Sequence, residues 1–337
     1  MANIVCFGEL LLRIGSPDSE PLLHSSALQG FVGGAEANVA VALAALGHGV
    51  TMVSAIPDNV LGQACVRELQ RHGVRTAAIQ RVSGRLGLYF LNSGAMLRPA
   101  EVIYDRAGSA FAEIKPSAYD WPELLRGADW LHVSGITPAL SQSAHDALVD
   151  ALATAKRLGT RISFDCNFRP NLWAGREALA KKVLGELARQ PQLLFAGVRD
   201  VAQLFGHDVG AQPPHDAFAH AARYLFDQCP DLGMIATTHR KVCGSDHHEL
   251  EGYYADRTTV VASRRLTLQP IVDRIGAGDA FAAGVIHAVD RRLTPQQIVD
   301  FGTASCALKH SIRGDASPFA ARDIEYVLQA ELVDVRR

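Results

Sequence analysis

The chain has 337 residues, of which 48% are hydrophobic and 20% are charged, and its formal net charge at pH 7 is -2. This length suffices for one large α/β domain with an appendage, or for two modest domains, with a sizeable buried core. The balanced charge argues against a disordered chain and against nucleic acid as a partner. We therefore expect a small-molecule ligand.

The first residues, MANIVCFGELLLRIG, have no basic stretch ahead of an apolar one, which argues against a signal peptide. Apolar runs throughout the chain are shorter than a membrane span. The six cysteines are scattered without a C-x-x-C pair, which favours reduced thiols over a disulfide framework. We expect a cytoplasmic protein with no membrane partner.

Short apolar strands alternate with longer helical segments along most of the chain. This β-α-β order predicts a Rossmann-like, doubly wound, mainly parallel sheet in an α/β fold. The predicted strands span residues 4–7, 50–56, 130–136, 161–167, 193–197, 233–242 and 253–263. The predicted helices span residues 35–46, 65–74, 145–159, 176–189, 279–292 and 295–310.

Residues 80–113 interrupt this alternation. The segments GLYFLN and EVIYDRA are rich in β-branched and aromatic residues and flank a turn at 92–94, which predicts a β-hairpin in a stretch without helices. Together with residues 10–30, the hairpin predicts a small β lid that closes over the core. The α/β core then comprises residues 1–9, 31–79 and 114–330.

The segment DRIGAGDAFAAG, residues 273–284, places a glycine-rich turn directly before a helical run. Backbone NH groups at a helix N-terminus carry partial positive charge, and Gly276, Ala277 and Gly278 would let a phosphate approach them closely. Asp279 beside such an anion hole suits a general base that accepts a proton from an attacking hydroxyl. The alternative is a plain helix cap after a glycine turn.

Two other nucleotide-binding motifs fit this sequence poorly. Phe281 stands where a dinucleotide fingerprint needs its third small residue, and the turn lies far from the first βαβ unit. The chain has no G-x-x-x-x-G-K-[ST] sequence, which excludes a P-loop kinase.

The segment GGAEANVAVALAALG at 33–47, together with 273–284, resembles the paired signatures of the PfkB, or ribokinase-like, carbohydrate kinases. The resemblance covers essentially the whole chain. It implies a ribokinase-like fold, ATP as co-substrate, Mg²⁺ as cofactor and Asp279 as the catalytic base. The residues that it assigns to the sugar are Gly33, Gly34 and Asn38, and those that it assigns to the nucleotide are Asn167, Arg169, Gly276 and Gly278.

Two further segments, FDCNFRPNLW at 164–173 and VIYDRAGSA at 102–110, resemble the family branch that phosphorylates 2-keto-3-deoxygluconate. Tyr104 and Arg106 project from one face of a strand, and Arg169 follows the carboxyl end of another strand, where α/β proteins bind ligands. Two arginines favour a sugar that carries a carboxylate, because guanidinium binds carboxylate in a bidentate manner. On the paired lid strand, Tyr89 would pack against the sugar.

Several of these residues have alternative roles. An arginine on an exposed strand could be solvated, and Arg169 could pair with Asp165 or bind the ATP phosphates. Asn167 could orient substrate or nucleotide, or form an Asx-turn ahead of Pro170. Asp273 could line a monovalent-cation site, for example one for K⁺, or cap a turn.

Two segments depart from the family pattern. Many relatives carry Asn-x-x-Glu, a motif associated with the magnesium water network, at the place of residues 197–200. Gly197 cannot replace the amide, although Asp200 could keep the acidic role. The segment 237–249 replaces a glycine-bearing loop that contacts the nucleotide. Its histidines could bind a metal or remain solvated, and they are His239, His247 and His248.

We expect transfer of the ATP γ-phosphoryl group to the terminal hydroxyl of 2-keto-3-deoxygluconate. Kinases of ribose, fructose, 2-keto-3-deoxygalactonate or a nucleoside are the alternatives among enzymes, and a catalytically silent sugar-binding protein is the alternative outside them. A homodimer joined through the lids is expected, because exposed lid strands need their edges protected.

Overall fold

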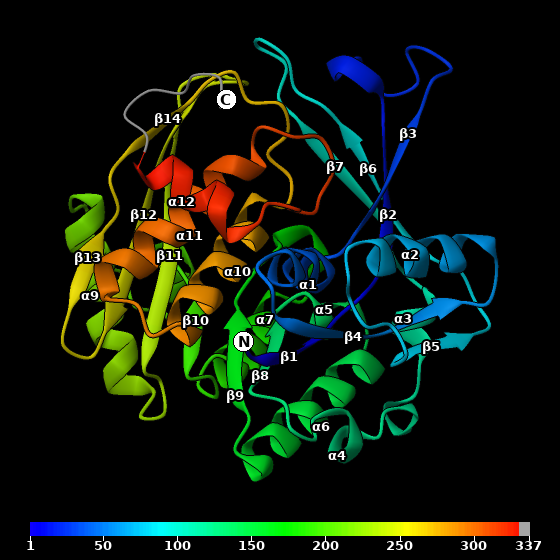
Figure 1. Cartoon of the computed structure of the whole chain (residues 1–337), viewed down its shortest axis with the longest axis horizontal. Coiled ribbons are helices and arrows are strands. Elements are labelled where there is room, and N and C mark those ends of the chain that lie inside the picture. Colours follow the sequence, from blue (N-terminus) through cyan, green and yellow to red (C-terminus); the bar gives the residue numbers. More distant parts are fainter. Residues whose placement is uncertain (330–337) are drawn as a thin grey trace.

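Two β-sheets organise the computed structural model, which describes residues 1–329 (Figure 1). The large sheet has ten strands in the order β13-β12-β11-β10-β9-β8-β1-β4-β5, with β14 paired to β12. Neighbouring strands from β11 to β5 run parallel, and β12 pairs antiparallel with β11, β13 and β14. The predicted doubly wound, mainly parallel sheet is confirmed. The strands are β1 (Asn3–Phe7), β4 (Gly49–Pro57), β5 (Ile79–Val82), β8 (Trp130–Ser134), β9 (Arg161–Asp165), β10 (Leu193–Phe195), β11 (Met234–Val242), β12 (His248–Asp256), β13 (Val260–Ala262) and β14 (Leu266–Leu268).

The strand order reverses beside β1. From this strand the chain continues to β4 and β5 on one side, and later to β8 through β11 on the other. Open α/β sheets bind ligands at such a switch point, outside the carboxyl ends of the strands. The topology therefore directs attention to the residues that follow β1, β8 and β9.

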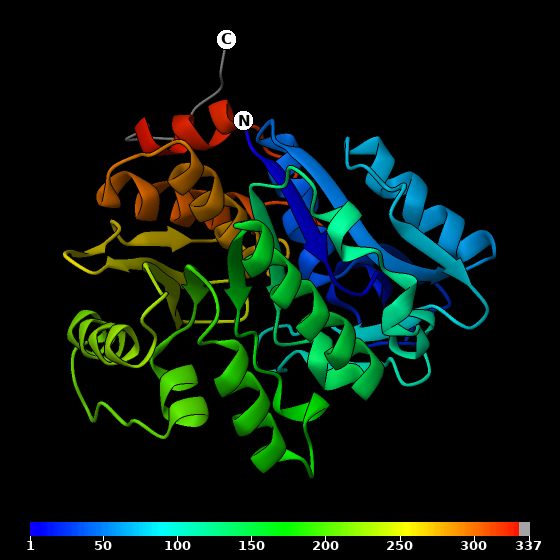
Figure 2. The same cartoon turned by 90° about the horizontal axis from the view of Figure 1, so that it is seen from below.

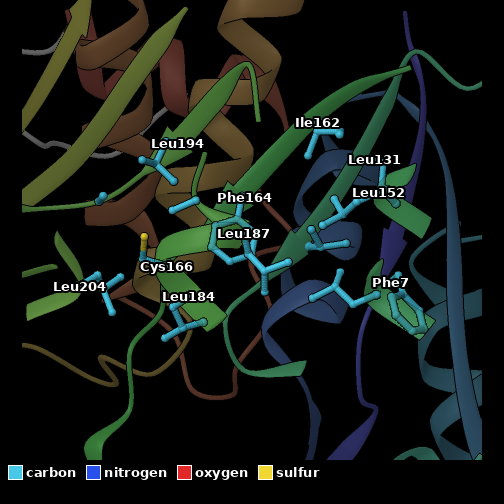
Figure 3. Packing of buried hydrophobic residues seen from close by; sticks show 14 of the residues in the cluster. Phe7, Leu131, Leu152, Ile162, Phe164, Cys166, Leu184, Leu187, Leu194 and Leu204 are labelled. Carbon is cyan, nitrogen blue, oxygen red and sulfur yellow. The ribbon is translucent and has the colours of Figure 1, made fainter. Parts of the chain in front are cut away.

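Helices cover both faces of the large sheet (Figure 2). Strand β1 shows why, because Val5 and Phe7 pack into one core cluster while Ile4 and Cys6 pack into the other. Figure 3 shows part of the first cluster, in which Phe164 and Leu187 lie near the centre of the view and Phe7 lies at its right-hand side. The helices are α1 (Ala35–Ala45), α2 (Val60–Arg71), α3 (Ala110–Glu113), α4 (Trp121–Leu124), α5 (Thr137–Leu140), α6 (Gln142–Leu158), α7 (Glu177–Leu187), α8 (Val198–Asp200), α9 (Pro214–Gln228), α10 (Ala277–Asp290), α11 (Pro295–Lys309) and α12 (Ala321–Gln329).

A second, four-stranded sheet has the order β3-β2-β6-β7 and stands at the upper right of Figure 1. Its strands β6 and β7 pair antiparallel, so the predicted hairpin is confirmed. Residues 31–33 pair with β2 in this sheet, although the sequence analysis placed them in the core, and residues 80–82 pair with β4 in the large sheet. The strands are β2 (Leu11–Gly15), β3 (Gln29–Gly33), β6 (Gly87–Asn92) and β7 (Glu101–Asp105).

Local structure differs from the sequence prediction in several places. The short helix α3 falls within 80–113, where no helix was expected, and the strand predicted at 253–263 is divided between β12 and β13 by a turn. Helices α9 and α12 were not predicted. The strand predicted at 233–242 is present as β11, and its second half forms a β-hairpin with the start of β12 within the segment 237–249. Residue 330, the last of the predicted core, lies outside the described residues.

Among residues 1–329, no helix is long and apolar enough to cross a membrane.

Candidate active site

The candidate site lies where β1, β8 and β9 end. Glu9 follows β1, and Asp165 is the last residue of β9. The neighbouring helix α1 contributes Glu36, whose buried carboxylate is hydrogen-bonded by the Ser134 hydroxyl at the end of β8. Carboxylates from separate parts of the sequence therefore meet at the switch point.

The predicted anion-hole turn forms the start of α10. Gly276 is the N-cap residue and has a left-handed backbone, with φ 77°, and a Cβ there would lie 1.7 Å from the Asp315 carbonyl oxygen. Only glycine satisfies both conditions. Ala277 and Gly278 lie in the first turn, where backbone NH groups have no acceptor within the helix, and the Ala277 NH group donates to the Arg274 carbonyl oxygen at 3.4 Å. These amides are the donors that an anion hole requires.

Asp279 occupies the first turn of α10 and accepts a hydrogen bond from Asn38, with Nδ2 2.7 Å from Oδ2. Asn38 lies on α1, so this contact joins the two segments that resemble the family signatures. Burial raises the pKa of Asp279 to about 7, and Glu36 and Asp315 add to the rise, whereas the Asn38 hydrogen bond and Arg169 oppose it. A carboxyl group that titrates near neutral pH suits proton transfer.

Asp165 and Asp200 complete the acidic surroundings. Burial and the charge of Asp279 raise the pKa of Asp165 to about 7, while Arg169 opposes the rise. The Asp200 carboxylate accepts a hydrogen bond from the Gly197 amide at 2.8 Å and thereby caps α8. Its pKa is also raised by burial. Asp200 thus lies within electrostatic reach of Asp165. Of these two aspartates, Asp165 was not predicted as a site residue.

The glycine pair at the start of α1 is tightly packed. Gly34 is the N-cap residue, with φ 139°, and a Cβ there would lie 2.2 Å from the Glu9 carbonyl oxygen. Gly33 ends β3, and a Cβ there would lie 2.3 Å from the Asp315 carboxylate. Gly33 therefore lets β3 approach the Asp315 carboxylate, and Gly34 lets the start of α1 approach the backbone carbonyl group of Glu9.

Tyr104 and Arg169 line one pocket of about 320 Å³ between β7 and the segment after β9. Arg169 is exposed there, and it interacts electrostatically with Asp165, Asp200 and Asp279. Tyr104 and Arg169 therefore share one pocket, whereas Arg106, the second arginine that was expected to converge on the sugar, is not among the residues that line it.

Arg106 is not solvated. Its side chain is 7% exposed, and its Nε lies 2.6 Å from the carboxylate of Glu9, which also accepts a hydrogen bond from Ser109. Of the Arg106 side-chain nitrogens, Nε alone has a hydrogen-bond partner among the described residues. The guanidinium lies beside the Tyr104 ring, 5.9 Å from its centroid.

Tyr89 belongs to a network that the sequence analysis missed. Its hydroxyl donates to Asp315 at 2.5 Å, and Arg13 pairs with both Asp315 and Asp273, at 3.1 Å and 2.6 Å. The Asp273 carboxylate also accepts hydrogen bonds from the Ile275 and Gly314 amides. Arg13 lies on β2 and Tyr89 on β6, so the network joins the small sheet to the turn before α10.

Replacing Tyr89 with phenylalanine should therefore lower the free energy of unfolding by about 1–3 kcal/mol, because Asp315 loses its hydroxyl donor in a buried setting. Urea denaturation monitored by fluorescence measures this change. Tyr104→Phe is the matched control on the facing strand, and its stability should stay at the wild-type value. Equal stability losses in the two variants would contradict the structural role of the Tyr89 hydroxyl.

Asn167 has a left-handed backbone, with φ 39°, and its backbone NH group donates to Asp165 Oδ1 at 3.0 Å. The turn is therefore closed by the Asp165 side chain, and the Asn167 Oδ1 atom is buried without a partner among the described residues.

The histidines of the 237–249 hairpin do not form a metal site. The described part of the chain contains no group of three or more His, Cys, Asp or Glu residues able to hold a metal ion. His239 is exposed, but His248 is fully buried at the start of β12. Burial lowers the pKa of His248 to about 4, so it is a neutral core residue and not a solvated one.

A buried carboxyl base lies beside the amides of a helix N-terminus and within electrostatic reach of Arg169, which lines a pocket next to the small sheet. This is the arrangement of a phosphotransferase that acts on a sugar hydroxyl. Residues 1–228 match the model of the pfkB family of carbohydrate kinases. This chain belongs to that family and is a sugar kinase.

Its relatives are similar over nearly their whole length. A 2-dehydro-3-deoxygalactonokinase of Haloferax volcanii is 30% identical, with 97% of each chain covered. A 2-dehydro-3-deoxygluconokinase of Bacillus subtilis is 28% identical, with 95% of this chain and 93% of the relative covered. The crystal structure of a 2-dehydro-3-deoxygluconokinase of Thermotoga maritima is 34% identical, with a TM-score of 0.94 and 98% and 100% of the chains covered.

Proposed function

We propose that this kinase phosphorylates the terminal hydroxyl of a 2-keto-3-deoxy sugar acid, with 2-keto-3-deoxygluconate as the substrate and its 6-phosphate as the product. The observation that carries the proposal is the pocket lined by Tyr104 and Arg169, within electrostatic reach of Asp279. An exposed guanidinium there offers bidentate hydrogen bonds to a carboxylate. The named relatives support a keto-deoxy sugar acid as the substrate class.

In the proposed reaction, Asp279 accepts the proton of the sugar hydroxyl as its oxygen forms a bond to the γ-phosphorus of ATP. The bond between that phosphorus and the oxygen bridging to the β-phosphate breaks, and ADP leaves. Amides of Gly276, Ala277, Gly278 and Asp279 stabilise the charge that develops on the phosphoryl oxygens. The small sheet excludes water, which would otherwise accept the phosphoryl group.

Magnesium would accompany ATP and neutralise charge on its outer phosphates. Asp165 and Asp200 fit this role, because each is a carboxylate at the end of a parallel strand or just beyond one, and Mg²⁺ prefers one or two protein carboxylates together with phosphates and water. Asn167 is proposed to contact the nucleotide phosphates, and Gly33, Gly34 and Asn38 the sugar. A homodimer joined through the small sheets stays a prediction.

The substrate is tested by measuring ADP formation directly with 2-keto-3-deoxygluconate, 2-keto-3-deoxygalactonate, ribose, fructose and adenosine. Arg169→Ala should raise KM for the keto-deoxy acids by about 10-fold or more, because it removes a charge-assisted contact worth about 1.5–3 kcal/mol. The matched control, Arg71→Ala on α2, removes an exposed arginine and should leave KM unchanged.

Preferred turnover of a neutral sugar would overturn the sugar-acid proposal and leave the kinase assignment in place. The galactonate epimer is the second candidate, because the relative in Haloferax volcanii bears its name. The ratio of kcat/KM for the two epimers decides between them.

A further inference from the structure

Lys309 is the last residue of α11 and is fully buried, with 0% of its surface exposed. An ammonium group removed from water needs acceptors or opposite charges around it. Its Nζ lies 3.4 Å from the carbonyl oxygen of Asp273 and 3.2 Å from that of Ile312. The lysine thus joins two backbone segments that are otherwise linked through Asp273 and Gly314.

Both segments bear directly on the anion-hole turn. Asp273 lies three residues before Gly276 and accepts the Ile275 amide at 3.0 Å, which shapes the turn from one side. The segment after Ile312 places the Asp315 carbonyl oxygen where a Cβ of Gly276 would be, 1.7 Å away, which confines the turn from the other side. A shift of either segment would therefore move the amides that follow Gly276.

The charges around Lys309 are balanced. The carboxylates of Asp273 and Asp315 face it, and Arg13 pairs with the same two carboxylates from the small sheet. Burial lowers the pKa of the Lys309 ammonium, and the two carboxylates oppose that shift. Lys309 and Arg13 thus share two carboxylates beside the anion hole, and the charge of Asp279 also acts on Lys309.

We infer that Lys309 is a positioning residue: a tethered cation that holds the anion-hole turn in its catalytic shape, so that phosphoryl transfer needs no free monovalent cation at this turn. The inference rests on the proposed role of the turn at 276–279. Carbonyl and carboxylate oxygens would also hold K⁺ or ammonium, so the Lys309 ammonium occupies the place where Asp273 was expected to bind such an ion.

The wild-type enzyme tests the inference without any substitution. We expect the same kcat for 2-keto-3-deoxygluconate in potassium chloride and in tetramethylammonium chloride. The tetramethylammonium cation is too large for the site. ADP should be measured by chromatography, because coupling enzymes can have cation requirements of their own. A kcat that collapses in tetramethylammonium and is restored by K⁺ would overturn the inference.

Variants of Lys309 test the mechanism. Lys309→Ala should lower kcat on the order of 100-fold with KM little changed, because a displacement of about 1 Å at a catalytic group has such an effect. Ammonium or K⁺ should restore part of the loss by entering the vacated space. Lys309→Met fills that space with an apolar chain and should not be rescued. Lys156→Ala, an exposed lysine in the last turn of α6, is the control and should show neither effect.

Rescue separates this positioning role from a purely structural one, because added cation would not restore a misfolded variant. Full activity of Lys309→Ala without added cation would overturn the inference. If both Lys309 variants fail to fold, the wild-type comparison of cations still decides. If the wild type turns over no sugar in any cation, the proposed function fails, whereas a melting temperature of Lys309→Ala that rises with K⁺ still reports the cation site.

Discussion

Replacing Asp279 with asparagine is expected to lower kcat by at least about 100-fold, which is the usual contribution of a general base. The amide keeps the shape of the carboxylate and can accept the same hydrogen bond from Asn38, so the fold should persist. The KM for sugar and for ATP should change little, because the lost interaction acts on the proton in the transition state. Single-turnover measurements with saturating ATP isolate this step.

Asp216→Asn is the matched control, because Asp216 is an exposed aspartate in the first turn of α9 and lies outside the site. Its kcat should equal that of the wild type. A near-normal kcat in Asp279→Asn would remove Asp279 from the mechanism, even if the chain still bound sugar and ATP.

The raised pKa of Asp279 gives this prediction a pH dependence. The base must be ionised, so kcat/KM of the wild type should rise with pH and level off above about pH 7. A folded-state pKa above the unfolded value means that the native state binds more protons between about pH 4 and 7, so this carboxyl group lowers stability as pH rises through that window. Asp279→Asn should therefore raise the melting temperature at pH 8 by more than it does at pH 4.

The fold was largely predictable because its signals are local. Strands of a parallel sheet are buried on both faces and read as short apolar runs, and Ile4 to Phe7 is such a run. The hairpin of β6 and β7 was predictable from its turn and its β-branched residues. Helix α9 was missed because it follows a polar, proline-containing stretch. The strand predicted at 253–263 did not reveal the short turn that separates β13 from β12.

The site was predictable only where a motif marked it. Asp279, Asn38 and the glycines lie in two signature segments, and the structure brings these segments together. Glu36 lies in one of them, and a carboxylate in an otherwise apolar helix was a signal that could have found it. Asp315 and Lys309 carried no such signal, because their importance arises from contacts with Gly276 and Asp273, which only the tertiary structure defines.

Arg106 shows how a correct strand pattern can still conceal a contact. The alternation on β7 indicated the face from which Arg106 projects, but it could not show that Glu9, 97 residues earlier, would lie 2.6 Å away. Replacing Arg106 with methionine should lower the free energy of unfolding by about 3–5 kcal/mol, because it leaves a buried carboxylate without its cation. Urea denaturation measures the loss.

The double variant Glu9→Gln/Arg106→Met separates stability from ligand binding. Removing both charges should recover most of the lost stability, so the sum of the two single effects should exceed the effect of the pair. Additive losses would contradict the ion pair. If the double variant folds stably but its KM for 2-keto-3-deoxygluconate is higher than that of the wild type, the terminal nitrogens of Arg106 are sugar ligands. A normal KM would leave Arg169 as the carboxylate-binding residue and confine Arg106 to anchoring the small sheet on Glu9.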